Sequence, residues 1–164
     1  MAEIVREGGC GCGALRYRVT GEPISVNNCH CKQCQHQTGS TSVVNALFEA
    51  ARVTLLSGTL TRNVVKAGSG GPHEIVRCSA CGVAVWSHYP RFGKLAMGVR
   101  VGTLDDTSTL RPDAIIFTSE AMPWVAFPPG IPKFDRSYNF ADVLPPDRAT
   151  RLQKIIDRRQ AGEG

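Results

Sequence analysis

The sequence lacks a long apolar run. No part of its 164 residues approaches the roughly 20 consecutive apolar residues that a membrane-spanning helix needs. The N-terminal stretch MAEIVREGGC also lacks the apolar core of a secretory signal peptide. We therefore expect a cytoplasmic protein with no membrane partner, in a compartment where thiols stay reduced. Internal repeats and low-complexity linkers are missing too, so we expect one domain with its own core.

Long helical patterns are scarce, because 17 glycines and 10 prolines interrupt the chain often. Residues 14–20 alternate between apolar and polar side chains, which indicates a half-buried strand. Similar short runs predict strands at 41–48, 52–65 with a break near 57–58, 74–78, 83–89, 94–101 and 114–119. The fold is therefore predicted to be mainly β. Trp86 and Trp124 are expected in its core.

Two helical segments are expected in addition to the strands. A short helical turn is predicted at 32–38, where Gly39 would stop it. A longer C-terminal helix is predicted after Pro145-Pro146, with Asp147 as its cap. Its buried stripe is expected to hold Leu152, Ile155 and Ile156.

Cysteine carries most of the chemical information. The chain has seven cysteines, an odd number that cannot all pair in disulfides. They form three clusters, Cys10/Cys12, Cys29/Cys31/Cys34 and Cys78/Cys81. In a reducing compartment, C-x-C and C-x-x-C spacings indicate metal ligands. Redox use of the C-x-x-C pairs is the alternative, but it leaves the C-x-C pairs unexplained.

Two of these clusters make a set of four. Structural zinc takes four ligands in a closed tetrahedron, usually as two short pairs from separate parts of the chain. Cys10/Cys12 with Cys78/Cys81 would make such a stabilising site. The remaining trio, Cys29/Cys31/Cys34, would leave a zinc ion with one open position, the general form of a catalytic or ligand-exchanging site. Three thiolates leave that site with a net negative charge, which favours a soft thiolate as the fourth ligand.

Two other arrangements stay open at this stage. A fourth protein ligand would close the trio, and His36 is the nearest candidate. His30 lies between two cysteines and is expected to point away from the metal. The spacings also allow Cys29/Cys31 to pair with Cys78/Cys81, which would leave Cys10/Cys12 free.

The charge of the chain does not favour a nucleic-acid partner. The formal net charge of +5 treats every cysteine as a neutral thiol. Seven thiolates with two Zn²⁺ ions change the charge by about −3 and leave about +2. The basic residues are also dispersed, apart from the segment DRRQ at 157–160. No nucleic acid is therefore expected among the partners.

Three segments together resemble the glutathione-dependent formaldehyde-activating (GFA) enzyme family, also called the centromere protein V-type zinc domain. They are GGCGCGALRYRVTGEP at 8–23, NCHCKQCQHQTGS at 28–40 and RCSACGVAVWSHYP at 77–90. Residues 101–135 are similar to the C-terminal part of the same family. The resemblance implies an Mss4-like fold, a twisted, mostly antiparallel β-sheet assembly with zinc knuckles and a short C-terminal helix. We expect 1–140 to be the zinc-binding β domain and 141–164 its helical extension.

The resemblance also implies two zinc sites and an activity. The structural ligands would be Cys10, Cys12, Cys78 and Cys81, and the functional ligands would be Cys29, Cys31 and Cys34. The family's name reaction condenses formaldehyde with glutathione to S-hydroxymethylglutathione and is classed as a carbon–sulfur lyase. Glutathione and an aldehyde would then be the small-molecule partners. The alternative is a non-catalytic zinc module that acts as a thiol carrier or protein-interaction domain.

Glutathione recognition requires basic groups near the functional zinc, because glutathione carries two carboxylates. Lys32 and Arg77 each adjoin a ligand cysteine in the sequence. We therefore expect these two side chains to bind glutathione.

Overall fold

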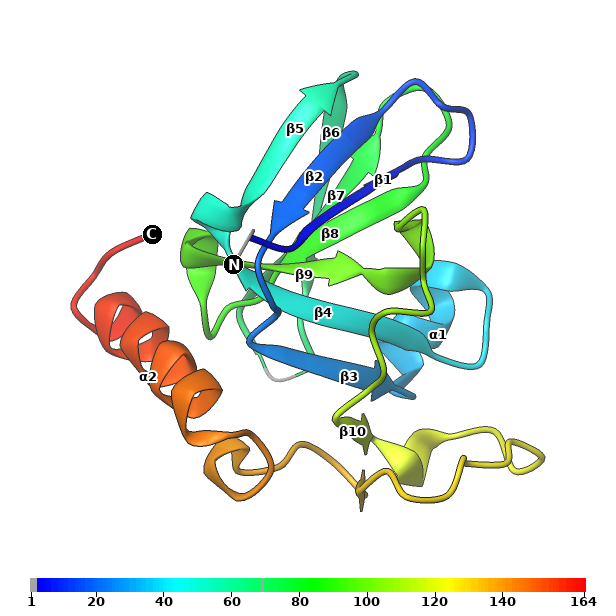
Figure 1. The fold of residues 1–164 in the computed structure, drawn as a ribbon. Coiled ribbons are helices and arrows are strands. Elements are labelled where there is room, and N and C mark those ends of the chain that lie inside the picture. Colours follow the sequence, from blue (N-terminus) through cyan, green and yellow to red (C-terminus); the bar gives the residue numbers. More distant parts are fainter. Residues whose placement is uncertain (1–2, 69) are drawn as a thin grey trace.

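The computed structural model describes residues 3–68 and 70–164, and its strands form two sheets (Figure 1). The smaller sheet has the order β1-β2-β5, and the larger one β11-β10-β3-β4-β9-β8-β7-β6. The strands are β1 Val5–Gly9, β2 Arg16–Thr20, β3 Ser25–Cys29, β4 Val43–Glu49, β5 Val53–Ser57, β6 Leu60–Lys66, β7 Pro72–Cys78, β8 Ala84–His88, β9 Ala96–Arg100, β10 Ala114–Ile116 and β11 Lys133–Phe134. The α-helices are α1 Lys32–Thr38 and α2 Pro146–Gln160. Short 3-10 helices span Ala50–Arg52, Gly93–Leu95, Val101–Thr103, Thr118–Glu120 and Phe140–Asp142. The predicted mainly β fold with a C-terminal helix is confirmed.

The smaller sheet packs on one face of the larger sheet and makes the main core. Leu15 directly precedes β2, and Tyr17 and Val19 lie within it. All three side chains are fully buried against residues of β4, β8 and β9. The Tyr17 and Trp86 rings meet edge to face, with centroids 5.6 Å apart. The alternation predicted for 14–20 is therefore confirmed, and its apolar face is the one that joins the two sheets.

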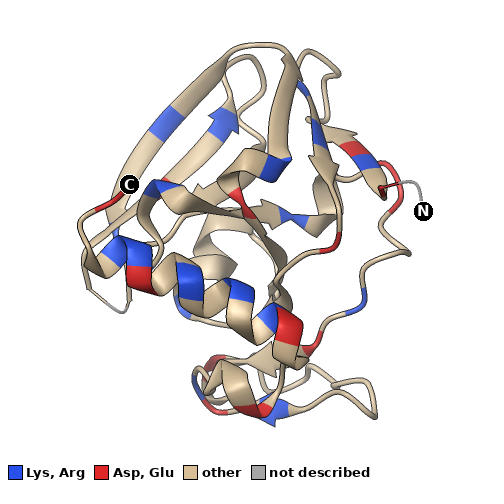
Figure 2. Ribbon diagram, turned by 60° about the vertical axis from the view of Figure 1, so that its left-hand side comes forward, with Lys and Arg blue, Asp and Glu red and all other residues tan. Residues whose placement is uncertain are grey.

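The opposite face of the larger sheet carries the two α-helices. At one end, α2 buries Leu152, Ile155 and Ile156 against Ile24 and Leu47, as the sequence predicts. Its charged residues are mostly Lys and Arg, with Asp near each end of the helix (Figure 2). At the other end, α1 contacts β4 and ends at Gly39 in the left-handed conformation, with φ 63°.

The register of three central strands places the polar side chains that matter for the site. Cys29 of β3 pairs with Val43 of β4, and Asn45 of β4 pairs with Arg100 of β9. Because side chains alternate along a strand, these four residues share one face of the sheet. This is the face that α1 covers, so the end of β3, the start of β4 and the end of β9 meet beneath that helix.

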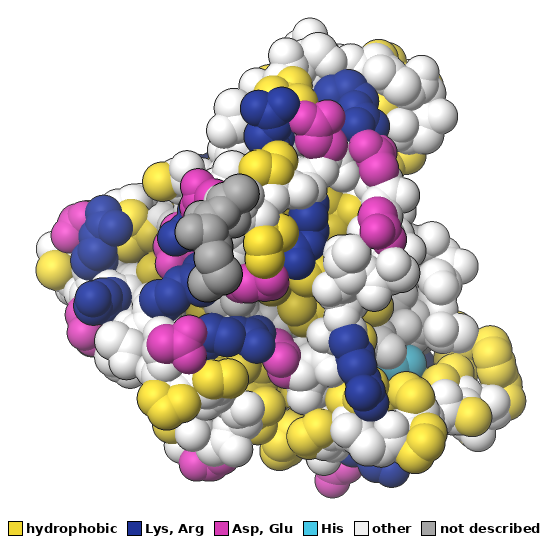
Figure 3. Space-filling model, in the orientation of Figure 1, with side chains coloured by type: hydrophobic (Ala, Val, Ile, Leu, Met, Phe, Trp, Pro, Cys, Tyr) yellow, Lys and Arg dark blue, Asp and Glu magenta, His cyan; other side chains and the backbone are white. Residues whose placement is uncertain are grey.

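Several local expectations are wrong. Asp147 does not cap α2, because Pro145 is the N-cap residue and Pro146 already begins the helix. Strand β10 ends at Ile116, three residues earlier than predicted, because Phe117 adopts the left-handed conformation with φ 57°. Trp124 is 72% exposed instead of lying in the core. Hydrophobic side chains gather on the surface over the segment that follows β10, at lower right in Figure 3.

None of the helices in the described part of the chain is long and apolar enough to span a membrane.

Candidate metal centres

Four cysteines from distant parts of the chain form the first centre. Cys10 and Cys12 lie in the loop between β1 and β2, Cys78 ends β7, and Cys81 lies in the turn between β7 and β8. The four sulfur atoms all lie within 4.8 Å of one another. Cys10 Sγ is 3.4 Å from Cys12 Sγ, and Cys12 Sγ is 4.0 Å from Cys78 Sγ. The cluster therefore connects the smaller sheet to the larger one.

Backbone N–H groups make this centre suitable for thiolates. The Leu15 N–H donates to Cys10 Sγ at 3.3 Å and is the main reason that the pKa of Cys10 falls to about 6. The Val83 N–H likewise is the main cause of a lowered pKa at Cys81. Gly82 has φ 76°, which lets the turn fold back so that its N–H donates to the Cys78 carbonyl at 2.9 Å. The thiolate is the form that binds metal, so these donors favour a bound ion.

Three cysteines at the junction of β3 and α1 form the second centre. Cys29 ends β3, Cys31 is the N-cap residue of α1, and Cys34 lies in the first turn. Their sulfur atoms lie within 4.8 Å of one another, and the Cys34 N–H donates to Cys31 Sγ at 3.4 Å. Cys29 and Cys34 are buried, whereas Cys31 is half-buried. Solvent or a ligand therefore reaches this centre on the Cys31 side.

The three thiols of the second centre change one another's pKa. Hydrogen bonds with the Cys29 and Cys34 thiols, followed by the N–H groups of Cys34 and Gln33, lower the pKa of Cys31. Hydrogen bonds with the Cys31 and Cys34 thiols raise the pKa of Cys29, and burial adds to that rise. A divalent soft cation would replace the protons that these sulfur atoms now share. An all-sulfur donor set of this kind suits zinc, so the residues fit the metal.

Neither histidine joins the three-cysteine centre. Within residues 3–68 and 70–164, the ligand atoms grouped there come from Cys29, Cys31 and Cys34 alone. His36 is exposed on α1. His30 is buried and meets the Phe127 ring edge to face at 5.2 Å. The alternative pairing of Cys29/Cys31 with Cys78/Cys81 is also absent, since Cys10/Cys12 lie with Cys78/Cys81.

The end of β10 and the segment after it form a wall of the second centre that sequence reasoning missed. Ile116 and Phe117 pack against the cysteines, and the φ of 57° at Phe117 is rare for a bulky residue. Glu120 Oε2 accepts from the Lys32 N–H at 2.6 Å, and the Glu120 carbonyl accepts from Gln35 Nε2 at 2.9 Å. These bonds hold the first turn of α1, which carries Cys34. No local pattern in the sequence signals this long-range contact.

The two basic residues expected to bind glutathione lie at different centres. Lys32 is exposed beside the three cysteines, where its Nζ donates to Gln35 Oε1 at 3.3 Å. Arg77 lies beside the four cysteines and donates to the Gly82 carbonyl at 3.0 Å. Arg77 also lines a cavity of about 490 Å³ between α1 and the Cys81 turn, and Arg100 lines the same cavity. Sequence reasoning missed Arg100, although a charged residue in the apolar run LAMGVRV was a signal.

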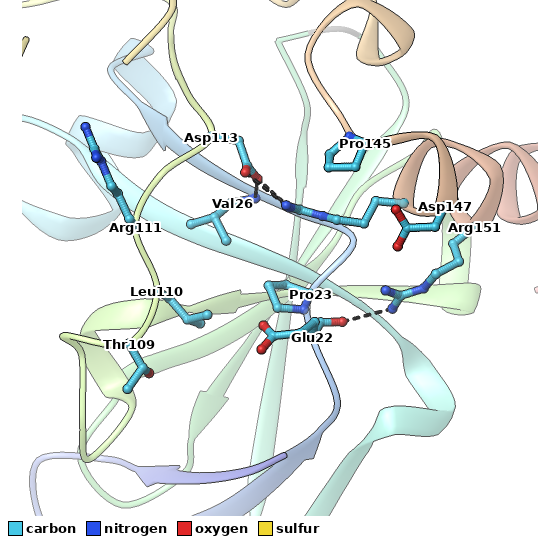
Figure 4. Close-up of a pocket in the computed structure, with 11 residues that line it drawn as sticks. Glu22, Pro23, Val26, Thr109, Leu110, Arg111, Asp113, Pro145, Asp147 and Arg151 are labelled. Atoms are coloured by element: carbon cyan, nitrogen blue, oxygen red, sulfur yellow. Dashed lines mark hydrogen bonds and ion pairs between the residues drawn. The ribbon is translucent and has the colours of Figure 1, made fainter. Parts of the chain in front are cut away.

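A second concavity, of about 330 Å³, lies where α2 meets the start of β3 (Figure 4). Four of the six charged residues that line it, Glu22, Asp113, Arg148 and Arg151, form hydrogen bonds or ion pairs with other parts of the chain. Asp113 accepts from Arg148 at 2.5 and 3.0 Å, and also from the Val26 N–H at 2.7 Å. Arg151 donates to the Glu22 carbonyl at 3.0 Å, as Figure 4 shows. These contacts attach α2 to the sheet, and we assign this concavity a structural role.

Comparison with known proteins agrees with the cysteine pattern. The model of the family described as glutathione-dependent formaldehyde-activating enzyme matches residues 5–120. A Halomonas elongata protein named "Putative glutathione-dependent formaldehyde-activating enzyme" is 32% identical over 93 residues. That match spans 54% of this chain and 59% of the relative's length. A Rhodobacter sphaeroides crystal structure aligns with 78% of this chain and 98% of its own, at 18% identity and a TM-score of 0.46. The match over residues 5–120 shows that the chain belongs to the GFA family.

Proposed function

We propose that this protein acts on adducts between a thiol and an aldehyde, with glutathione and formaldehyde as the reactants that its family suggests. The observation that carries the proposal is the cluster of Cys29, Cys31 and Cys34, which has three sulfur ligands and a partly exposed side. Zinc with three protein ligands and one open position is the general form of a reactive site. The four-cysteine cluster, in contrast, would close a tetrahedron and stabilise the fold.

Each cysteine cluster and the residues around it would have a distinct role. Cys10, Cys12, Cys78 and Cys81 would hold a structural zinc, and Cys29, Cys31 and Cys34 would hold a second zinc. When bound there, zinc would supply Lewis acidity that stabilises a thiolate near neutral pH. Ile116 and Phe117 exclude water from the buried side of the cluster. Glu120 holds α1 in position, and Cys31 faces the approach route.

The proposed reaction forms one carbon–sulfur bond. The thiol sulfur bonds to the aldehyde carbon, and the thiol proton ends on the aldehyde oxygen, which becomes a hydroxyl group. The reverse direction breaks the same bond and returns the free thiol, so the class is carbon–sulfur lyase. Two reactants held together gain from proximity. We propose Lys32, beside the three cysteines, and Arg77, which lines the cavity that reaches α1, as the basic groups for the glutathione carboxylates.

Calorimetric titration tests the proposal directly. Glutathione is titrated into protein that is shown by metal analysis to hold two zinc ions per chain, and S-methylglutathione is the matched control. We expect glutathione to bind and S-methylglutathione to bind at least about tenfold more weakly, since the blocked sulfur cannot serve as a soft ligand. Equal binding of the two compounds, or no binding of glutathione, would contradict the proposal.

A second measurement distinguishes an enzyme from a thiol carrier. It is needed because formaldehyde also adds to thiols without a catalyst. The rate of exchange between glutathione and S-hydroxymethylglutathione is measured by NMR exchange spectroscopy with the wild-type protein and with Cys31→Ser. An increase in the exchange rate that Cys31→Ser abolishes supports the enzyme. Thiol-dependent binding without any increase in rate supports the thiol carrier instead.

A further inference from the structure

Arg100 is a buried cation whose contacts are all with neutral groups. It is only 4% exposed. Its guanidinium donates to Asn45 Oδ1, to Gln37 Oε1 at 2.7 Å, to Ser87 Oγ at 2.9 Å and to the Tyr89 hydroxyl at 3.4 Å. In the described part of the chain, no carboxylate lies within ion-pair distance of it. A buried charge without a counter-charge is strongly destabilising, so this arrangement needs an explanation.

Two other partly buried arginines each form an ion pair with a carboxylate. Arg148 pairs with Asp113 at 2.5 Å, and Arg151 pairs with Glu49 at 2.6 Å. Both side chains are more exposed than Arg100, yet each has its own carboxylate. The most buried of these cations is therefore the one that lacks an acidic partner.

The three-cysteine centre lies next to Arg100 on the same face of the sheet. Arg100 pairs with Asn45, and two residues along β4 Val43 pairs with Cys29. A strand spacing of about 4.8 Å and a rise of about 3.3 Å per residue place the Cα atoms of Arg100 and Cys29 roughly 12 Å apart. Gln37, which accepts from Arg100, lies one helical turn after Cys34. The guanidinium therefore points to the helix that carries the third cysteine.

Tyr89 and His73 lie between the cation and the cysteines. The Tyr89 ring stacks on the His73 ring at 4.7 Å, and His73 Nδ1 is 3.4 Å from Gln33 Oε1, between Cys31 and Cys34 in the sequence. Burial raises the pKa of Tyr89 to about 12; the charge of Arg100 opposes this rise, and charge at Cys34 and Cys29 adds to it. The pKa of Tyr89 therefore responds to Arg100 and to the cysteines in opposite directions.

We propose that Arg100 is the positioning residue that supplies the counter-charge of the three-cysteine metal site. Three thiolates with one divalent ion leave one net negative charge, which a single guanidinium balances. A thiolate as fourth ligand adds a second negative charge, and Arg100 keeps the net charge to one. Arg100 thereby favours an anionic thiol ligand. This inference deepens the proposed function, on which it rests.

The variant Asn45→Asp tests the charge directly. It leaves the shape of the side chain nearly unchanged but gives Arg100 a carboxylate of its own. If Arg100 balances the cysteines, zinc affinity at the three-cysteine site falls by about 10- to 100-fold, the usual effect of changing a residue behind a metal ligand. If Arg100 only holds the sheet together, the stronger charge-assisted bond leaves zinc affinity unchanged.

The readout is zinc affinity of each site from competition with a chromogenic chelator, and circular dichroism verifies folding. Asn63→Asp is the matched control, because it adds the same charge on the exposed edge strand β6. We expect a loss at the three-cysteine site in Asn45→Asp alone, with the four-cysteine site unchanged. Equal affinities in Asn45→Asp and Asn63→Asp would overturn the proposal.

Arg100→Lys and Arg100→Met decide the matter if Asn45→Asp does not fold. Lysine keeps the positive charge but lacks the planar set of N–H donors of a guanidinium. Arg100→Lys is therefore expected to bind zinc at the three-cysteine site about tenfold more tightly than Arg100→Met. Equal affinity in the two variants would refute the charge role. If the wild-type protein holds only one zinc ion, both the proposed function and this inference are refuted. If it holds two zinc ions and none of the variants changes zinc affinity, this inference alone is refuted.

Discussion

Replacing one cysteine in each centre should have unequal effects on stability. The perturbations are Cys81→Ser, which removes a ligand from the four-cysteine centre, and Cys31→Ser, which removes one from the three-cysteine centre. The first centre joins residues far apart in the chain, since Cys12 and Cys78 are 66 positions apart. The second joins residues within the stretch 29–34. The two cross-links therefore constrain the unfolded chain to very different degrees.

The size of the difference follows from loop-closure entropy. A cross-link that closes a loop of this length lowers the entropy of the unfolded chain and thereby raises its free energy by about 4 kcal/mol. A link within 29–34 raises the free energy of the unfolded chain by about 2 kcal/mol or less. Cys81→Ser is thus expected to destabilise the domain by about 2 kcal/mol more than Cys31→Ser. For a chain of this size, that difference corresponds to about 4–8 °C in Tm.

The assay is thermal unfolding followed by circular dichroism, with zinc content measured on each sample. Cys31→Ser should remain folded and hold one zinc ion fewer than the wild-type protein. Cys81→Ser should show the larger loss of Tm, and Ser79→Ala in the same exposed turn is the control. A Tm for Cys31→Ser at or below that of Cys81→Ser would refute the assignment of the two centres.

Three further predictions concern the scaffold. Leu152→Ala should lower the free energy of unfolding by about 2–5 kcal/mol, because Leu152 is buried in the contact of α2 with the sheet. A single unfolding transition in calorimetry would support our proposal that 141–164 belongs to the same domain as 1–140. Gly39→Ala should cost about 1 kcal/mol in denaturant unfolding, since its φ is 63° and no atom crowds its Cβ position. Partial burial acts to raise the pKa of Glu49, but the hydrogen bonds from Arg151, the backbone N–H of Glu49 and the charges of Arg151 and Arg52 together outweigh it and lower the pKa. The stabilisation is therefore present above the unfolded pKa and is lost as pH falls through the folded pKa, so the gap in Tm between wild type and Glu49→Gln should narrow from pH 7 to pH 4.

The sequence predicted features that depend on local patterns. The alternation in β2 follows from burial of one face, so Leu15, Tyr17 and Val19 were identifiable. The limits of α1 were identifiable because Gly39 accepts the left-handed conformation that ends a helix. The ligand number that zinc requires favoured the observed grouping of the cysteines, although the spacings also allowed Cys29/Cys31 to pair with Cys78/Cys81.

Features that depend on distant contacts were not predictable from local patterns. Strand β3 has the sequence SVNNC, with no alternation, and it is a strand because β4 and β10 pair with it. Trp124 was expected in the core because tryptophan is apolar, but the segment that carries it lies outside both sheets. Arg100 lies on a strand whose pattern is apolar, and its role depends on the register of β4 and β9. Register is a property of paired strands, so one strand alone does not contain it.

The sequence separation of the ligands also bears on how each centre works. The four-cysteine centre connects two sheets, so a metal bound there would stabilise the contact between them. The three-cysteine centre lies within one β–α junction, and β3, α1 and the 116–120 segment hold it from outside. A zinc ion bound there would have a fourth position that could exchange ligands while the rest of the domain stays folded. A binding site for a small thiol needs this property, because the ligand has to arrive and leave many times during the life of one folded chain.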